Sequence, residues 1–321
     1  MDIIMTERKN LGVFPTMITP FKKDGSIDIE TAEKYVEWYF NKGCFGIFAI
    51  CQSSEIWKMN TEEKITLSSA VYKKAKALAK ESGREFTVVC SGHTSESIEA
   101  QAAELTAVYE AGADALIWIT NRLDLNNEGD DVWIANAEKL LSLLPKDAKL
   151  GMYECPYPYK RLVTPKILKW CLSTGRFYFL KDTCCDKMMI RQRLDILRGT
   201  DFALMNANAQ TLLDSLQHGA AGYSSVMANF HPALYVWLCN NFEACPEKAK
   251  ILQSFLSTVA FTEAGLPYPL SAKYHMCLEG IPTENISRVR GAEVLTDYGK
   301  DCVEQMRDTC IEFAKSLEIE I

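Results

Sequence analysis

Eight short apolar runs, separated by longer amphipathic segments, constrain the fold of this 321-residue chain more than any other feature. The runs are apolar almost throughout rather than at alternate positions, which is typical of parallel strands buried on both faces. Strands that alternate with helices in this way form right-handed βαβ units. The runs are Val13–Ile18, Phe45–Cys51, Phe86–Cys90, Ala115–Ile119, Leu150–Cys155, Phe177–Lys181, Phe202–Met205 and Tyr223–Ala228.

The segments between the runs carry helix boundary signals. Thr61 and two following glutamates predict a helix that ends at Gly83, and Ser95–Ala111 predicts another that ends at Gly112. Proline follows Thr164, at a position that suits the first turn of a helix. Eight such units predict an α/β fold, a closed (β/α)8 TIM barrel. An open doubly wound sheet is the alternative, but no Gly-x-Gly-x-x-Gly motif follows any run.

The strand pattern stops after about residue 245. Pro246–Ala264, Ser271–Gly280 and Asp301–Ile319 predict three helices, and no low-complexity linker precedes them. We therefore expect residues 1–244 to form the barrel with an N-terminal arm. Residues 245–321 are expected to form a C-terminal three-helix extension that packs on the barrel.

Composition excludes several classes of function. The net charge is −7 and no basic run occurs, so no nucleic-acid partner is expected. No apolar run reaches membrane-spanning length, and Met1–Asn10 lacks the apolar core of a signal peptide, so a cytoplasmic protein is expected. The twelve cysteines contain no Cys-x-x-Cys and favour reduced thiols, with a redox-active Cys184–Cys185 pair as the alternative. The four histidines are isolated, so no metal site is predicted.

Lys181 is the first candidate for chemistry. Catalytic groups in a barrel of this type lie at the C-terminal ends of the strands, and Lys181 ends an apolar run. Desolvation there lowers the pKa of the amine, and a neutral amine is the nucleophile that Schiff-base chemistry requires. The alternative is a lysine that extends to solvent or pairs with Asp182.

Polar residues at other strand ends complete the candidate site. Tyr153 ends the preceding run, where its phenol can transfer protons, although a core or interface tyrosine is the alternative. Ser53 and Ser54 follow the second run, where hydroxyl and backbone N–H groups suit a carboxylate or cap a helix. The remaining predicted substrate-binding residues are Gln52 after the second run, Ala207 after the seventh and Ser224 in the eighth.

Several of these segments resemble the dihydrodipicolinate synthase and N-acetylneuraminate lyase family of class I pyruvate aldolases. The 28-residue step from Tyr153 to Lys181 fits the spacing of that family. The matching segments are Val13–Phe21 (TALVTPF in the family), Gly112–Asp114 (GAD), Tyr153–Pro156 (YNxP), Phe179–Asp182 ((I/G)-(I/L)-K-(D/E)), Gly222–Asn229 (GxISxxAN) and the tail Tyr268–Lys273.

The resemblance implies a homotetrameric barrel enzyme with a three-helix extension. It implies that Lys181 forms a Schiff base with a small 2-keto acid, pyruvate first, and that Tyr153 transfers protons. Ser53 is implied to bind the keto-acid carboxylate, and Ser224 to offer a backbone carbonyl. The partners are then a 2-keto acid and an aldehyde, and no cofactor is needed beyond the lysine imine.

Three positions depart from the family pattern. Gln52 replaces the hydroxyl residue that passes a proton to the tyrosine, and Thr120–Leu123 lacks the tyrosine that a neighbouring subunit contributes. Pro158 occupies the position of the arginine that binds the carboxylate of the aldehyde. An acidic aldehyde such as aspartate semialdehyde is therefore predicted to react poorly unless Arg122 or Arg161 replaces that contact.

The sequence does not identify the second reactant. The candidates are a sugar-acid fragment, an aromatic aldehyde and aspartate semialdehyde. Alternatives to a general pyruvate aldolase are dihydrodipicolinate synthase proper, a 2-keto-3-deoxy acid dehydratase and an aromatic hydratase-aldolase. Tyr153–Lys160 resembles the last group, with Trp57, Tyr157 and Tyr159 as lining for an apolar pocket. A non-enzymatic sensor that binds a keto acid is the alternative from another class.

Overall fold

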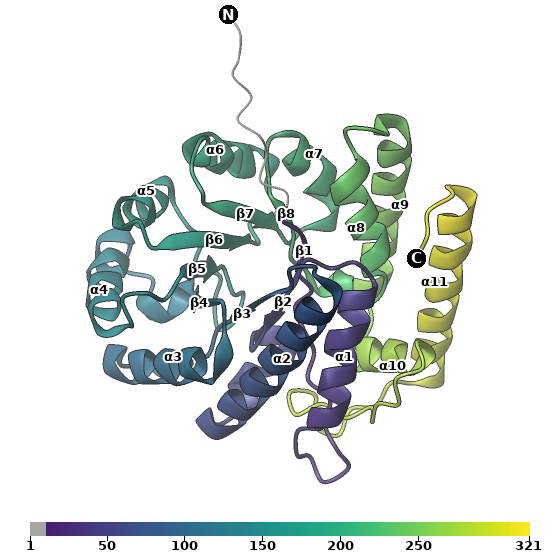
Figure 1. Cartoon of the computed structure of the whole chain (residues 1–321), viewed down its shortest axis with the longest axis horizontal. Coiled ribbons are helices and arrows are strands. Elements are labelled where there is room, and N and C mark those ends of the chain that lie inside the picture. The colour runs from purple at the N-terminus through teal and green to yellow at the C-terminus, as the bar shows by residue number, and fades with distance from the viewer. Residues whose placement is uncertain (1–10) are drawn as a thin grey trace, which may run out of the picture.

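The computed structural model describes residues 11–321, and its eight parallel strands form the predicted barrel (Figure 1). Neighbouring strands follow the order β1-β8-β7-β6-β5-β4-β3-β2. Backbone hydrogen bonds close the seam between the first two strands, from Phe45 N to Val13 O at 3.1 Å and from Phe48 N to Pro15 O at 2.9 Å. The strands are β1 Gly12–Val13, β2 Gly46–Ala49, β3 Thr87–Cys90, β4 Ala115–Ile119, β5 Leu150–Tyr153, β6 Phe177–Asp182, β7 Ala203–Asn206 and β8 Gly222–Tyr223.

The expected N-terminal arm, and the prediction based on Met1–Asn10, lie outside the described residues. Within residues 11–321, no helix combines the length and apolarity that a membrane crossing requires.

A ring of helices surrounds the strands (Figure 1). Asn60 and Glu63 form a reciprocal capping box at the start of α2, and Gly83 ends that helix as predicted. The third helix begins later than expected because Ser97, not Ser95, caps it by accepting from Ala100 N. The helices are α1 Ile29–Asn41, α2 Thr61–Ser82, α3 Ile98–Gly112, α4 Asp130–Leu143, α5 Pro165–Thr174, α6 Lys187–Leu197, α7 Leu212–Gln217 and α8 Pro232–Asn241.

Three helices follow the barrel, as predicted: α9 Pro246–Ala264, α10 Leu270–Leu278 and α11 Asp297–Ser316. The last begins four residues before the expected Asp301 because the Thr296 side chain caps it by accepting from Gly299 N. Helix α9 packs against α7 and α8, and α11 contacts α9 and α10 (Figure 1). The domain boundary between residues 244 and 245 stays a prediction.

An aromatic column fills the barrel below the candidate site. Phe179 lies 5.6 Å from Phe14 and 6.5 Å from Phe48 between ring centroids, and Phe48 lies 5.5 Å from Tyr153. A Cβ atom at Gly46 would lie 2.3 Å from the Phe14 ring, so only glycine allows that ring to fill the interior. The column excludes water from below and supports the floor of the cavity above it.

Candidate active site

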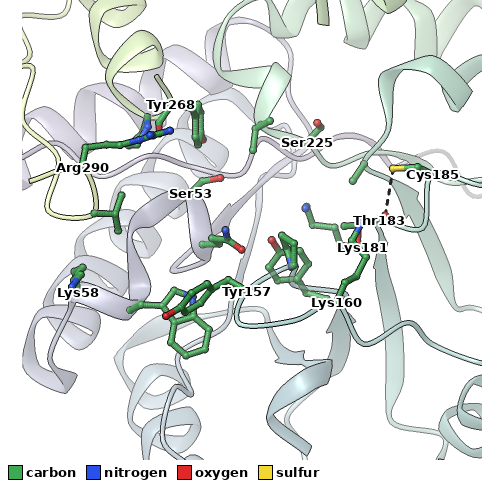
Figure 2. A pocket seen from close by; sticks show the side chains of 18 residues that line it. Ser53, Lys58, Tyr157, Lys160, Lys181, Thr183, Cys185, Ser225, Tyr268 and Arg290 are labelled. Carbon is green, nitrogen blue, oxygen red and sulfur yellow. Dashed lines mark hydrogen bonds between the residues drawn. The ribbon is translucent and has the colours of Figure 1, made fainter. Parts of the chain in front are cut away.

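A cavity of about 600 Å³ opens at the C-terminal ends of the strands (Figure 2). Tyr153 on β5 and Lys181 on β6 pair directly in the parallel register, and both line this cavity. The Lys181 amine lies 4.2 Å from the centroid of the Tyr153 ring. The two residues expected to be neighbours therefore lie together on the cavity floor.

The environment of Lys181 favours a neutral amine. The side chain is only 4% exposed, and burial lowers its pKa to about 8. The neighbouring Cys51, Cys155 and Glu154 oppose that shift. Lys181 does not extend to solvent, and Asp182 pairs with Arg193 instead, so the alternative reading of this lysine is wrong.

A buried cluster fixes the ends of β5 and β6. The Arg193 guanidinium pairs with Asp182 through Nη1 and with Glu154 through Nη2 at 2.6 Å. The Glu154 carboxylate also accepts from Val163 N at 2.7 Å and Thr183 N at 2.8 Å. Burial raises the pKa of Glu154, while the two carboxylates raise the pKa of Arg193 against the effect of its own burial. This cluster holds the strand ends that carry the lysine and tyrosine.

Three of the predicted substrate-binding residues line the cavity, and two do not. Gln52, Ser53 and Ala207 line it. Ser54 turns into the barrel wall, where its hydroxyl donates to Met17 O at 2.7 Å. Ser224 is fully buried and outside the lining; its neighbour Ser225 lines the cavity instead.

The carboxylate-binding candidate, Ser53, lies in a short polar row. Its hydroxyl donates to Thr16 Oγ1 at 3.0 Å, and Tyr268 lines the cavity beside it (Figure 2). The Tyr268 hydroxyl accepts from Asn229 Nδ2 at 3.2 Å. Ser53 and Tyr268 thus present hydroxyl groups to the same end of the cavity.

Two of the three expected aromatic residues line the cavity. The rings of Trp57 and Tyr157 meet edge to face, with centroids 5.3 Å apart. Tyr159 is outside the lining because its hydroxyl donates to Asp124 O.

Known proteins with similar sequences share this architecture. The family model described as "Dihydrodipicolinate synthetase family" matches residues 9–121. A 4-hydroxy-tetrahydrodipicolinate synthase of Methanothrix thermoacetophila is 27% identical over 72% of this chain and 74% of its own. An uncharacterised DapA-like lyase of Pyrococcus abyssi is 24% identical over 89% and 95% of the two chains.

A solved structure of a sialic acid aldolase from Ruminococcus gnavus, a catalytic lysine mutant, has the same fold. It superposes with a TM-score of 0.83 at 15% identity and covers 96% of this chain and 98% of its own. In sequence and fold the chain is similar, at low identity, to members of the dihydrodipicolinate synthase and N-acetylneuraminate lyase family. These similarities indicate a carbon–carbon lyase.

Relative to this family's pattern, the contacts of Tyr153 differ. Gln52 stands where the resemblance expects a hydroxyl, and its Oε1 accepts from Cys155 Sγ at 3.0 Å. The Tyr153 phenol is hydrogen-bonded to the same thiol, and burial raises the pKa of Tyr153 well above its usual value. Burial also raises the pKa of Cys155, to about 11. A neutral thiol and an amide therefore occupy the place of the expected relay.

The family's arginine for the second carboxylate is absent, and the two candidate replacements do not line the cavity. Arg122 Nη2 donates to Ser95 O at 2.9 Å. Arg161 pairs with Asp124 at 3.1 Å and Asp130 at 2.7 Å. Two carboxylates therefore engage Arg161, while the Arg122 guanidinium lies 5.6 Å from the centroid of the Trp57 ring, outside the lining.

Three other cationic residues line the cavity, and none of them is among the predicted site residues. Lys58 ends the short 3-10 helix η2 Ile56–Lys58, Lys160 follows β5, and Arg290 lies in the loop between α10 and α11. Arg290 could have been found only from a contact between the extension and the barrel, which no local pattern encodes.

Metal ligation was not expected, and no group of three potential ligands from His, Cys, Asp and Glu occurs within residues 11–321. The absence of a metal and of a separate cofactor stays a prediction. All twelve cysteines are free thiols.

Proposed function

We propose that this lyase forms a Schiff base between Lys181 and pyruvate or a related 2-keto acid. The supporting observation is the buried Lys181 amine, with a pKa of about 8, beside Tyr153 on the cavity floor. At pH 7 roughly a tenth of such amines are neutral, compared with about one in three thousand for an ordinary lysine. The site therefore supplies a nucleophile under conditions where most lysines do not.

The Lys181 amine attacks the C2 carbonyl of the keto acid, and the carbonyl oxygen leaves as water, which gives an iminium. In the cleavage direction, the C3–C4 bond breaks and its electron pair enters the iminium to form an enamine. The proton of the C4 hydroxyl is lost as the aldehyde forms, and the enamine is protonated at C3 before hydrolysis releases pyruvate. Tyr153 moves these protons, and Ser53 binds the carboxylate.

The cavity has room for a second reactant beside pyruvate. Its volume, about 600 Å³, equals that of about twenty waters in the liquid at roughly 30 Å³ each, whereas pyruvate has only six heavy atoms. This supports aldol cleavage or condensation. A 2-keto-3-deoxy acid dehydratase would use the same iminium with hydroxide as the leaving group, so a product assay must distinguish the two reactions.

Borohydride trapping tests the Schiff base directly. Pyruvate with borohydride should add one reduced adduct to the peptide that contains Lys181, and Lys181→Ala should abolish it. Labelling of another lysine, or no labelling with pyruvate or a larger 2-keto acid, would contradict the mechanism and favour a keto-acid sensor. Pyruvate release from a panel of 4-hydroxy-2-keto acids then separates aldolase from dehydratase.

Family resemblance also supports a homotetramer in the cytoplasm. Light scattering at micromolar concentration should give about four times the mass of the 36.2 kDa chain. A monomer would contradict this expectation.

A further inference from the structure

The cavity is strongly cationic although the whole chain is acidic. The chain contains 42 acidic and 35 basic residues. Yet the lining includes four cationic residues, Lys58, Lys160, Lys181 and Arg290, and no aspartate or glutamate from the described part of the chain. A cavity lined in this way attracts anions and disfavours cations.

We propose that Arg290, Lys58 and Lys160 form an anion subsite at the cavity mouth, which binds a carboxylate or phosphate on the second reactant. The proposal rests on the proposed function, because it assigns Lys181 and Ser53 to the keto acid. The three mouth residues are then left for the other end of the ligand. Figure 2 shows Lys58 and Arg290 on one side of the cavity and Lys160 below Lys181.

The contacts of Arg290 orient its guanidinium and pair it with only one carboxylate, which is partly exposed. Its Nε donates to Tyr268 O at 2.8 Å, beside the hydroxyl row of Ser53 and Tyr268. Its Nη1 lies 3.3 Å from Glu293, an ion pair in which both side chains are about 40% exposed. Exposed pairs of this kind are weak and are easily exchanged for a ligand. Because arginine has five N–H donors, Arg290 retains donors for a bidentate contact with an anion.

A buried ion pair holds the loop of Arg290 over the cavity. The Glu55 carboxylate accepts from Lys273 Nζ at 2.8 Å, from Ser287 Oγ at 2.9 Å and from Val289 N at 2.9 Å. Ser287 Oγ in turn accepts from Arg290 N at 3.1 Å. Since Glu55 directly follows the loop of Gln52 and Ser53, one carboxylate fixes both ends of the ligand site.

Hydrogen bonds also anchor the Lys58 segment through its backbone and the Lys160 side chain through its amine. Lys58 O accepts from Arg288 Nη1 at 2.8 Å, which ties the end of η2 to the Arg290 loop. Lys160 Nζ donates to Thr183 O at 2.9 Å, which leaves two of its three N–H groups for a ligand. Three separate segments therefore contribute cationic residues to the lining of one cavity.

This inference reverses the expectation from the sequence that acidic aldehydes react poorly. That expectation followed from Pro158, and the structure supplies the cation from another part of the chain. A neutral aldehyde gains nothing from these side chains. The favoured second reactant is therefore a short aldehyde with a terminal carboxylate or phosphate.

Matched aldehydes test the subsite. With pyruvate as donor, kcat/KM is compared for succinic semialdehyde and butanal, and for glyceraldehyde 3-phosphate and glyceraldehyde. At low salt, at least one charged aldehyde should exceed its neutral partner by roughly 10- to 100-fold, the usual range for a charge-assisted contact. The pair with the larger ratio shows whether a carboxylate or a phosphate is preferred. Raising the ionic strength should lower the ratio of kcat/KM for the charged aldehyde to kcat/KM for its neutral partner.

Two variants locate the effect. Arg290→Gln should reduce the charged-to-neutral ratio about tenfold or more, because it removes a charge-assisted contact. Arg198→Gln removes a 63% exposed charge on the far end of α6 and should leave the ratio unchanged. Equal kcat/KM for charged and neutral aldehydes in the wild-type protein, or an equal loss of both in Arg290→Gln, would overturn the subsite.

A binding measurement separates the subsite from the Schiff base. Titration calorimetry with succinate and with glycerol 3-phosphate requires no imine. Weaker binding of one of these anions to Arg290→Gln than to wild type and Arg198→Gln supports the subsite even if borohydride labels nothing. Equal binding to all three proteins contradicts it even if Lys181 is labelled.

Discussion

The floor and the mouth of the cavity are built in different ways. The floor, Tyr153 and Lys181, consists of strand ends whose positions follow from the parallel register of β5 and β6. The mouth, Lys58, Lys160 and Arg290, consists of loop residues. The floor residues match the general family pattern, whereas of the mouth residues only Lys160 belongs to a segment that resembles a subgroup of the family. The comparison indicates that the barrel fixes the chemistry while the loops choose the second reactant.

Each region also has its own buried ionic support. The Arg193 cluster beneath the floor joins neighbouring strand ends, and its three side chains are at most 1% exposed. The Glu55–Lys273 pair beneath the mouth is equally buried but joins residues 218 positions apart. The first support acts within the barrel, and the second attaches the C-terminal extension to it.

Removal of the floor phenol should have the largest effect. Tyr153→Phe should reduce turnover by roughly 100- to 10,000-fold, the usual contribution of a general acid–base group. Borohydride trapping of pyruvate should decrease far less, because imine formation can take protons from water. The measurement compares kcat with the rate of adduct formation by mass spectrometry. An equal loss in both would mean that Tyr153 acts mainly in imine formation or in holding Lys181.

Disruption of the Arg193 cluster beneath the floor should have the next largest effect, in this case on the free energy of unfolding. Arg193→Met leaves Glu154 and Asp182 buried without a counter-charge and should cost about 3–5 kcal/mol of unfolding free energy. Glu154→Gln leaves a neutral Arg193–Asp182 pair and should cost only about 1–3 kcal/mol for the disturbed hydrogen bonds. Urea denaturation measures both. Equal costs would show that charge balance is not what stabilises this cluster.

Uncoupling the mouth from the barrel should have a smaller and more selective effect. The double variant Glu55→Gln with Lys273→Met removes both charges of the buried pair and releases the loop of Arg290. We expect roughly a tenfold rise in KM for a charged aldehyde, since the guanidinium is no longer held in place. The matched control is Glu55→Gln alone, which should be less stable because Lys273 remains buried and unpaired. An unchanged KM in the double variant would show that this pair does not position Arg290.

The difference between the floor and the mouth of the cavity also explains which residues the sequence could predict. The apolar runs and helix caps identified the barrel, the three C-terminal helices and the strand ends of Tyr153 and Lys181, because each depends on local periodicity. The strand-end rule could not separate Ser53 from Ser54, since adjacent residues point to different sides of the loop. Arg290 was missed because its place depends on contacts between residues more than 200 positions apart.

The Cys155 contact was missed for a different reason. The sequence showed that Gln52 replaces a hydroxyl, but not which group the amide would meet. That partner is a thiol two residues beyond Tyr153, and the sequence predicts it only as one of twelve reduced thiols. The directions of the side chains at the strand ends decide that Gln52 meets Cys155, and the composition of the sequence does not encode those directions.

The smallest expected effect is a shift in the pKa of Lys181. A floor residue and a mouth residue should shift this pKa in opposite directions. Burial lowers this pKa to about 8, Glu154 raises it and Lys160 lowers it. Imine formation needs the neutral amine, so its rate with subsaturating pyruvate should rise about tenfold per pH unit below pH 8 and level off above it.

Glu154→Gln removes a negative neighbour from the floor, so the apparent pKa should fall and the rate at pH 7 should rise by about twofold. Lys160→Gln removes a positive neighbour from the mouth, so the apparent pKa should rise and the rate at pH 7 should fall by a similar factor. Both changes in the pKa of Lys181 should be smaller than the lowering that burial causes, because burial is the largest influence on this pKa. Rapid-quench trapping from pH 6 to pH 10 measures both inflections. Shifts in the same direction would show that the two variants act through a change in structure and not through their charge.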